Sequence, residues 1–366
     1  MSKNNGKPKK RKILWKTNED TIIFDYKYND EIDNNLISDY RKLIFSNYEL
    51  NEKIFEYYAK DELYNLKNEE SKFNRDVSNL PLNITDIRFG WNFNQEVSKL
   101  PLELSNLIFG YNFNQEVSNL PLKLKYLSFG YEFNQEISNL PPFLIHLKLG
   151  WNFNQDVSSL PQNLIIIEFS HDFNKEVSSL PENLKELKFG SEFNQDVSRL
   201  PQNLTVISFG SNFNKDVSKL PQNLTHVIFE LYFNQDVSNL PQEITHLTFG
   251  RKFNQDVSNL PPSLKYLTFD YEFNQDVFSL PPFLIYLVFG WEFNKDVSLL
   301  PKNLTHLTLG YEFNQDISKL PESITHLTIG HKFNKEYIIP SNIKYLKLDC
   351  NNSYIINSLP NSIVEL

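Results

Sequence analysis

From residue 73 onward, apolar and polar residues follow a pattern that repeats every 20 residues. One copy runs from Pro201 to Leu220, and its apolar residues fall at positions +3, +6, +8, +12, +16 and +19 after the proline. The phenylalanine at +12 recurs fourteen times without a gap, from Phe73 to Phe333. A fixed period of this length is typical of a solenoid, in which stacked copies of one small unit bury a shared core.

Each unit is expected to contain one short strand. The piece from Leu204 to Phe209 ends in the alternation of a strand, and Pro201 precedes it, where a missing N–H group is harmless. Ten of the eleven glycines hold position +9, directly after this piece, as Gly210 does. Glycine there indicates either a positive φ or a close approach of two backbones. One unit buries too little to fold alone, so the strands of stacked units are expected to form a parallel ladder.

The repeated motif Leu-x-x-Leu-x-Phe-Gly-x-x-Phe-Asn-x-x-Val, closed by Leu-Pro, resembles the FNIP repeat of social amoebae and giant DNA viruses. The resemblance covers Phe73 to Leu366, but no proline follows the Phe-Asn pair as it does in that family's core. It implies a β-rich, right-handed, leucine-rich-repeat-like solenoid with a parallel β ladder of about 14–15 units.

Two polar columns accompany the phenylalanines. The asparagine after each one, from Asn74 to Asn334, predicts a structural ladder of stacked amides. The third residue after each phenylalanine is always acidic, from Asp76 to Glu336. These acids either cap backbone N–H groups of the following turn or form a calcium-binding row. A single acid in each loop favours capping, so we expect no metal site.

Positions +5 and +7 of each unit point away from the predicted core, and +5 and +10 are rich in Tyr, Trp and His. Aromatic side chains dominate binding hot spots, but they also stack along a ladder for stability alone, and both interpretations stay open. Histidines in neighbouring units supply at most half a zinc site. The residues predicted to contact a partner are Trp91, Tyr111, Tyr131, His146, Trp151, Tyr271, Tyr286, Trp291, His306, Tyr311 and His326.

Composition narrows the class of function. The net charge of −9 argues against general nucleic-acid binding, and the single cysteine, Cys350, excludes a disulfide framework. We find no phosphate-binding loop, dinucleotide motif or catalytic triad motif, so an enzyme and a cofactor are not expected. No secretory signal or long apolar run is present, which predicts a soluble, intracellular protein, cytoplasmic or nuclear, that binds neither nucleic acid nor membrane.

The first 70 residues lack the repeat. Residues 1–12 form a basic tail in which Lys9, Lys10, Arg11 and Lys12 resemble a nuclear-localisation signal, although such tails are also simply solvated. Residues 13–70 are expected to form a helical cap over the first unit of the 71–366 solenoid. The expected elements are strands at 13–15 and 21–28 and helices at 34–46, 51–58 and 61–66.

The stretch from Leu36 to Ser46 also resembles the opening of an F-box, with Ile37 in place of the family's proline. That resemblance implies docking to a ubiquitin-ligase subunit through Leu36, Leu43, Ile44 and Phe45. We therefore predict a non-enzymatic scaffold that binds a partner protein on its strand face. A ligase adaptor is the alternative.

Overall fold

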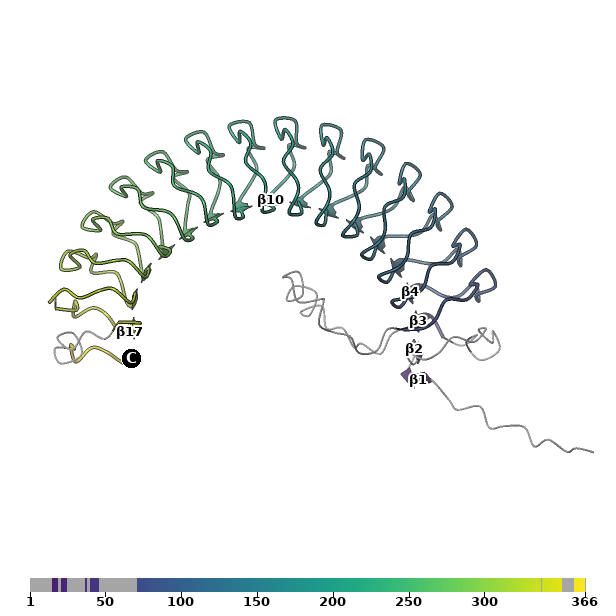
Figure 1. Cartoon of the computed structure of the whole chain (residues 1–366), viewed down its shortest axis with the longest axis horizontal. Helices are drawn as coiled ribbons and strands as arrows, with labels where there is room; N and C mark the ends of the chain where they lie inside the picture. Colours follow the sequence, from purple (N-terminus) through teal and green to yellow (C-terminus); the bar gives the residue numbers. More distant parts are fainter. Residues whose placement is uncertain are drawn as a thin grey trace, which may run out of the picture. The chain divides into compact units, whose positions relative to one another are not determined.

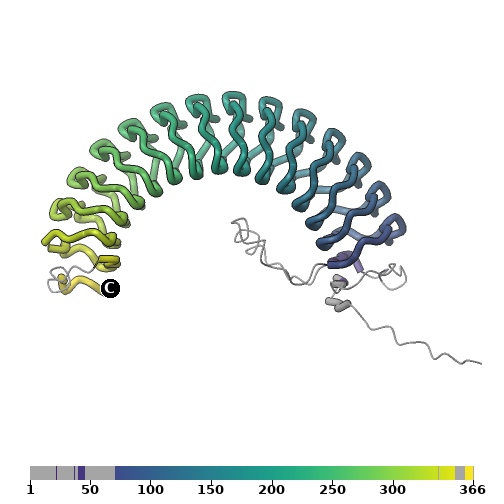
Figure 2. The backbone as a smooth tube through the Cα atoms, in the orientation of Figure 1, coloured from purple at the N-terminus to yellow at the C-terminus, as the bar shows by residue number. Residues whose placement is uncertain are grey.

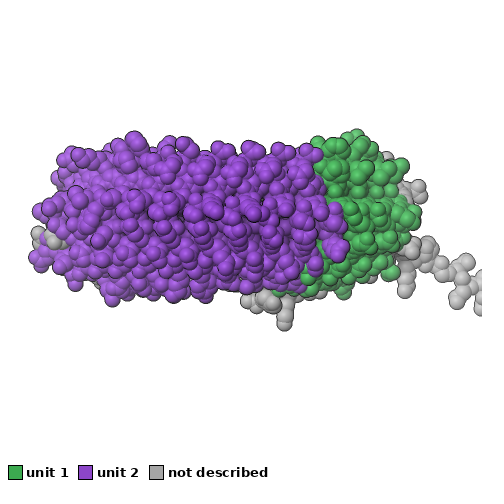
Figure 3. Space-filling view, turned by 90° about the horizontal axis from the view of Figure 1, so that it is seen from above, with its two compact units in different colours: residues 1–135, 139–144 green, residues 136–138, 145–366 purple. Residues whose placement is uncertain are grey.

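The computed structural model describes residues 15–18, 21–24, 37, 40–45, 71–336, 338–350 and 359–365 of the chain. The chain divides into two compact units, unit 1 with residues 1–135 and 139–144, and unit 2 with residues 136–138 and 145–366 (Figure 3). The strands of unit 1 are β1 (Trp15–Asn18), β2 (Thr21–Phe24), β3 (Lys42–Ile44), β4 (Asp86–Arg88), β5 (Asn106–Ile108) and β6 (Tyr126–Ser128).

Unit 2 holds the longer run of strands. They are β7 (His146–Lys148), β8 (Ile166–Glu168), β9 (Glu186–Lys188), β10 (Val206–Phe209), β11 (His226–Phe229), β12 (His246–Phe249), β13 (Tyr266–Phe269), β14 (Tyr286–Val288), β15 (His306–Leu309), β16 (His326–Ile329) and β17 (Tyr345–Leu348). Each strand pairs in parallel with the next, and equivalent residues face each other, as His226 faces His246. Within unit 2 the strands stack along one edge of successive turns and the return loops along the other (Figures 1 and 2).

The alternation along each strand decides what is buried. In β10, Ile207 and Phe209 are buried whereas Val206 and Ser208 are half-buried on the opposite side. Leu204, at the start of the piece, is also buried. The predicted β-rich solenoid, with one short strand in each repeat of about 20 residues, is confirmed in the described part of the chain.

Two rows of phenylalanine rings form the core. Phe209, at +8, and Phe213, at +12, are fully buried, and their ring centroids lie 4.0 Å apart. Each ring also stacks on the equivalent ring of the next turn, as Phe213 does on Phe233 at 6.0 Å. The prediction that the +12 column is a buried spine is confirmed, because aromatic stacking adds to the burial of large apolar surfaces.

Glycine at +9 is required by backbone proximity. A methyl group on Gly210 would lie 2.0 Å from the carbonyl oxygen of Gly190 in the preceding turn. Gly210 does not adopt the left-handed φ that would otherwise favour glycine. Of the two explanations for this column, close approach is the correct one here. Ser170, Glu230 and Asp270 occupy the same column, so the approach is not equally tight at every turn.

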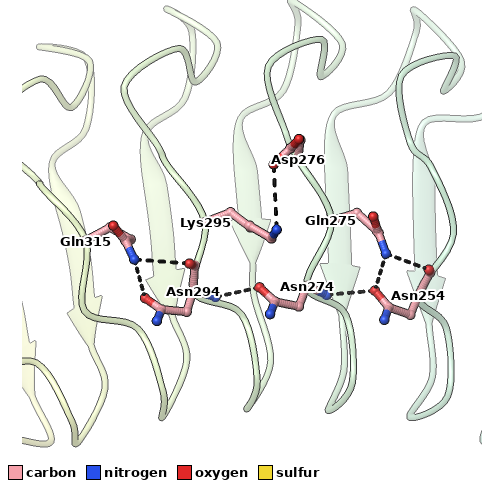
Figure 4. Close-up of polar contacts among 7 residues, drawn as sticks. All are labelled: Asn254, Asn274, Gln275, Asp276, Asn294, Lys295 and Gln315. Atoms are coloured by element: carbon pink, nitrogen blue, oxygen red, sulfur yellow. Dashed lines mark hydrogen bonds and ion pairs between the residues drawn. The ribbon is translucent and has the colours of Figure 1, made fainter.

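The asparagine column is the structural ladder that was predicted. The side-chain oxygen of Asn254 accepts the backbone N–H of Asn274 at 3.0 Å, and the oxygen of Asn274 accepts that of Asn294 at 3.0 Å (Figure 4). The amide of Gln275 donates to the same oxygen of Asn254 at 3.0 Å. Each asparagine thus satisfies a loop N–H group that would otherwise lack a partner.

The acidic column caps the next turn, as predicted. In the Asp216 unit, one carboxylate oxygen accepts the backbone N–H of Ser218 at 2.9 Å and the other accepts its hydroxyl at 2.8 Å. Where the acid is glutamate, as in Glu116, the hydrogen bond from Ser118 comes from the hydroxyl. In the Asp276 unit, Phe278 replaces the serine and Asp276 lies 3.9 Å from the amine of Lys295 (Figure 4).

Replacing Asp216 with alanine is expected to lower the free energy of unfolding by about 0.5–2 kcal/mol, the usual cost of a lost cap. The hydrogen bonds from Ser218, the backbone one first, hold the pKa of Asp216 below its ordinary value of 3.8. This stabilisation is therefore present above about pH 3.8 and disappears as the pH falls below that value. Urea melts at neutral and acidic pH measure both effects, with Glu116→Ala as the milder control. A large stabilisation by added calcium would instead support the metal-binding interpretation.

The repeat begins earlier than predicted, and the helix expected at 34–46 is wrong where the structure describes it. Lys42–Ile44 form strand β3, which pairs in parallel with both β2 and β4. The backbone N–H of Tyr40 bonds to the carbonyl of Ile37 at 3.1 Å, as that of Ile84 bonds to Pro81 at 3.3 Å. Ile37 thus takes the place of the repeat's proline, and pairing on two sides outweighs local helical spacing.

Ladder strands also precede β3. Strand β2 pairs antiparallel with β1, which places strands within or beside the predicted stretches 13–15 and 21–28. The helices predicted at 51–58 and 61–66 lie outside the described residues, and the described residues themselves form no helical element. In that same part of the chain, no helix has the length and apolar character needed to cross a membrane.

Candidate functional site

The strand face is the surface made by positions +5 and +7 of the strands, and it is considered separately for each unit. These side chains are mostly half-buried, whereas positions +6 and +8 are buried. The structural columns hardly vary between turns, but the strand face does: in unit 2 its +5 residues include His146, Glu186 and Tyr286. A face free of packing constraints is the expected place for binding.

A row of rings follows position +5 along unit 2. The ring centroids of His226 and His246 lie 4.0 Å apart, and those of His246 and Tyr266 lie 4.3 Å apart. The row continues through Tyr286, tilted against both neighbours, to His306 and His326, whose centroids are 3.9 Å apart. Tyr266 and Tyr286 are 40% and 38% exposed. The rings contact one another through their faces, so mainly their edges remain for a partner.

Threonines orient the histidines of this row. The hydroxyl of Thr245 lies 2.9 Å from Nδ1 of His246 and also 3.2 Å from the carbonyl of Thr225. Since the hydroxyl has one proton and the carbonyl can only accept, Nδ1 carries the proton that binds the hydroxyl. The lone pair of a neutral ring is then on Nε2. The Thr225–His226 and Thr305–His306 pairs have the same geometry.

The stacked histidines are poorly placed to share a metal ion. Parallel rings direct their Nε2 lone pairs side by side, whereas ligands of one ion must converge on it. Among the described residues, no three His, Cys, Asp or Glu side chains group as a metal site requires.

The aromatic residues at +10 lie in the turn after each strand and form separate stacks. The cluster predicted from Trp91 to His171 divides into two: Trp91, Tyr111 and Tyr131 stack in unit 1, and Trp151 stacks on His171 at 4.3 Å in unit 2. The second predicted cluster holds together, since Tyr271, Trp291, Tyr311 and His331 form one stack. Arg251 covers its first ring, 4.7 Å from the centroid of Tyr271. Trp291 stays 41% exposed.

A charged cluster on β7 and β8 was missed from the sequence. The carboxylate of Glu168 lies 2.9 Å from Nε2 of His146 and 3.2 Å from the amine of Lys148. Burial raises the pKa of Glu168, but the hydrogen bond from His146 and the charge of Lys148 outweigh it and lower the pKa to about 2. Opposite charges at +7 in neighbouring units, Lys148 and Glu168, were the available signal.

The residues predicted to dock a ligase subunit are placed differently from that interpretation. Leu43 and Phe45 are fully buried in the first turns, and Phe45 stacks on Phe73 at 4.1 Å. Ile44 is half-buried on the strand face. Leu36 and the basic residues Lys9, Lys10, Arg11 and Lys12 lie outside the described residues. The adaptor role stays a prediction.

Comparison with solved structures places the fold among leucine-rich-repeat proteins. The chain is similar to CroV588 of a giant virus, described as a novel circular LRR protein, with 33% identity and a TM-score of 0.72 over 96% of this chain and 63% of that one. It therefore spans less than two-thirds of that protein's length. The functional domain of InlJ from Listeria monocytogenes shares the fold at 18% identity, with a TM-score of 0.54 over 76% of this chain and 65% of that one.

No curated protein is matched by the sequence. The family model of the FNIP repeat matches nine stretches that together cover more than two-thirds of the chain: residues 97–132, 133–172, 173–199, 196–232, 216–252, 233–271, 273–310, 296–332 and 333–366. The phenylalanine spine and the asparagine ladder described above are the structural form of that repeat. The chain therefore belongs to the FNIP repeat family.

Proposed function

We propose that this protein is a non-enzymatic scaffold that binds a partner protein on its strand face. The observation that carries the proposal is the contrast between columns. Positions that build the solenoid repeat almost unchanged, whereas the strand face changes from turn to turn and keeps large rings partly exposed, including Tyr266 and Tyr286. Interfaces draw most of their binding energy from such partly exposed aromatic anchors.

The parallel ladder gives this face the size that a protein partner needs. In unit 2 it extends from β7 to β17, and neighbouring strands of a ladder lie about 4.8 Å apart. The described acidic and histidine side chains already have structural partners: the Asp column caps turns, and Glu168 is held by His146 and Lys148. Similarity to a leucine-rich-repeat fold adds to the case for a scaffold, since repeat arrays offer extended binding surfaces.

The test is the loss of a partner when exposed rings are removed. A partner captured by the full chain should bind at least about 2 kcal/mol more weakly, or roughly thirtyfold, to Tyr286→Ala or Trp291→Ala. Calorimetric titration of the purified pair measures this loss. Phe283→Ala is the matched control, because Phe283 is also exposed but lies in the turn before the strand.

The opposite pattern would reject the proposal. If Phe283→Ala weakens binding while Tyr286→Ala and Trp291→Ala leave it unchanged, the partner uses another surface and the stacked rings serve stability alone. Circular dichroism of each variant shows that the repeat fold is intact before binding is compared.

A further inference from the structure

We propose that the strand face from β11 to β17 binds an acidic polypeptide segment, and that protonation of its stacked histidines tightens this binding as the pH falls. The proposal rests on the proposed function, because it names the kind of partner and the regulation of the same face. The evidence comes from the charges on this part of the face, from the fixed orientation of the histidines and from their stacking.

The charges on this part of the face are all of one sign. At positions +4, +5 and +7 of β11 to β17 stand three lysines and four histidines, without a single aspartate or glutamate. These residues are Lys265, Lys344, Lys347, His226, His246, His306 and His326. The chain as a whole carries a net charge of −9, so this local excess of basic groups is a segregated feature. Complementary charge is what selects and orients an acidic partner.

The nearest carboxylates in sequence lie beyond the strands, at position +9, and two of the three have partners. Glu230 accepts a hydrogen bond from the hydroxyl of Ser211 at 3.0 Å, and Asp349 lies 3.4 Å from the amine of Lys347. Asp270 is the third. Neither interaction involves the histidine row, so its outer edges stay available to a ligand.

Each histidine in a threonine pair is set to change from acceptor to charged donor. With Nδ1–H bound to the threonine hydroxyl, a proton can add only at Nε2, and the threonine hydrogen bond is kept in the charged ring. Within the described part of the chain, no protein group is hydrogen-bonded to Nε2 of His226, His246, His306 or His326. The charged N–H group is therefore free to bind a carboxylate of the partner, and charge-assisted hydrogen bonds are the stronger kind.

The surroundings keep these rings neutral near pH 7. Burial lowers the pKa of His246, and the neighbouring His226 and Lys265 lower it further. Burial also lowers the pKa of His306, with His326 adding to the effect. The other titratable groups facing these pairs from adjacent strands are Tyr266, Tyr286, Tyr345 and Lys344, and none of them is an acid that could pair with a charged ring. A bound carboxylate supplies that pairing, so binding and protonation strengthen each other.

A polypeptide fits this face better than a nucleic acid does. Three lysines on a chain of net charge −9 offer too little positive charge for a ligand with a phosphate on every residue. A glutamate-containing segment has separated charges, and its apolar side chains have the exposed edges of Tyr266 and Tyr286 and the side chain of Val288 to contact.

The experiment measures binding of a fluorescent glutamate-rich peptide to the full chain by anisotropy, at about pH 7.5 and about pH 5.5. We expect at least about tenfold tighter binding at the lower pH. In the double variant His246→Asn/His306→Asn, which cannot protonate at these sites, the gain should shrink to about twofold or less. Lys265→Glu should weaken binding at both values, and His146→Asn, on β7, is the matched control that should behave like the unchanged protein.

Three results would overturn the proposal. Binding that is equal at both pH values removes the role of protonation, and a pH effect that survives in the double variant removes the stacked histidines. Tighter binding of single-stranded RNA than of the peptide removes the acidic polypeptide. None of these results affects the loss of a captured partner in Tyr286→Ala or Trp291→Ala, so the proposed function is tested separately.

Discussion

Replacing Phe213 with alanine is expected to lower the free energy of unfolding by about 3–5 kcal/mol. The ring is fully buried and lies 4.0 Å from Phe209 in its own turn. It also stacks on Phe193 and Phe233, both at 6.0 Å, in the turns before and after. Removing it leaves a cavity that two neighbouring turns border, and repeated turns cannot close it without breaking the register of the strands.

Denaturant melts of the full chain measure this loss, and the exposed Phe283 supplies the control. Phe283→Ala is expected to change stability by less than about 0.5 kcal/mol, since exposed side chains contribute little. A change below about 1 kcal/mol for Phe213→Ala would show that the ring is not part of the core. Because solenoid stability is a sum of local terms, amide hydrogen exchange should locate the weakening in the turns around residue 213.

Replacing Phe45 with alanine should have a comparable effect at the other end of the array, about 3–5 kcal/mol. Phe45 is fully buried between the rings of Phe73 at 4.1 Å and Phe89 at 5.8 Å. Its backbone N–H also donates to the carbonyl of Arg88 at 2.9 Å. The loss should appear as faster hydrogen exchange in residues 84–93, and Ile44→Ser, on the strand face of the same strand, is the control with a small effect.

The same variant separates the structural role of this segment from the adaptor interpretation. If Phe45 docks a ligase subunit, Phe45→Ala should abolish binding of that subunit while the exchange rates near residue 89 stay unchanged. Faster exchange in the first turns is the outcome that the burial of Leu43 and Phe45 leads us to expect.

The repeat made most of the fold predictable, because each conclusion could be checked fourteen times along the chain. The alternation of Leu204, Ile207 and Phe209 indicated the strand, and the acid two residues before Ser218 indicated the cap. The first turn was misread because its spacing of Leu36, Tyr40 and Leu43 fits a helix as well as a strand. The choice depends on β2 and β4, and β4 is 43 residues away from Leu43 in register, at Asp86 to Arg88.

The strand face was predictable in position but not in chemistry. Alternation placed Tyr286 and His306 outward, yet it could not show that their rings are tilted against each other while His306 and His326 stack in parallel. The contact of His146 with Glu168 joins position +5 of one turn to position +7 of the next, so neither column alone reveals it. The fixing of histidine rings by Thr245 and its equivalents depends on side-chain geometry that no period encodes.

The asparagine ladder has a consequence for how such proteins grow. Every internal turn offers one side-chain oxygen to its successor and donates one backbone N–H to its predecessor, as Asn274 does between Asn254 and Asn294. Duplicating a whole block of 20 residues adds one oxygen and one N–H and leaves both old junctions intact. A partial duplication would strand a buried phenylalanine out of phase and leave an amide unmatched. Gene segments of this kind can therefore lengthen or shorten only in complete turns, which leaves the strand face free to diversify after each copying event.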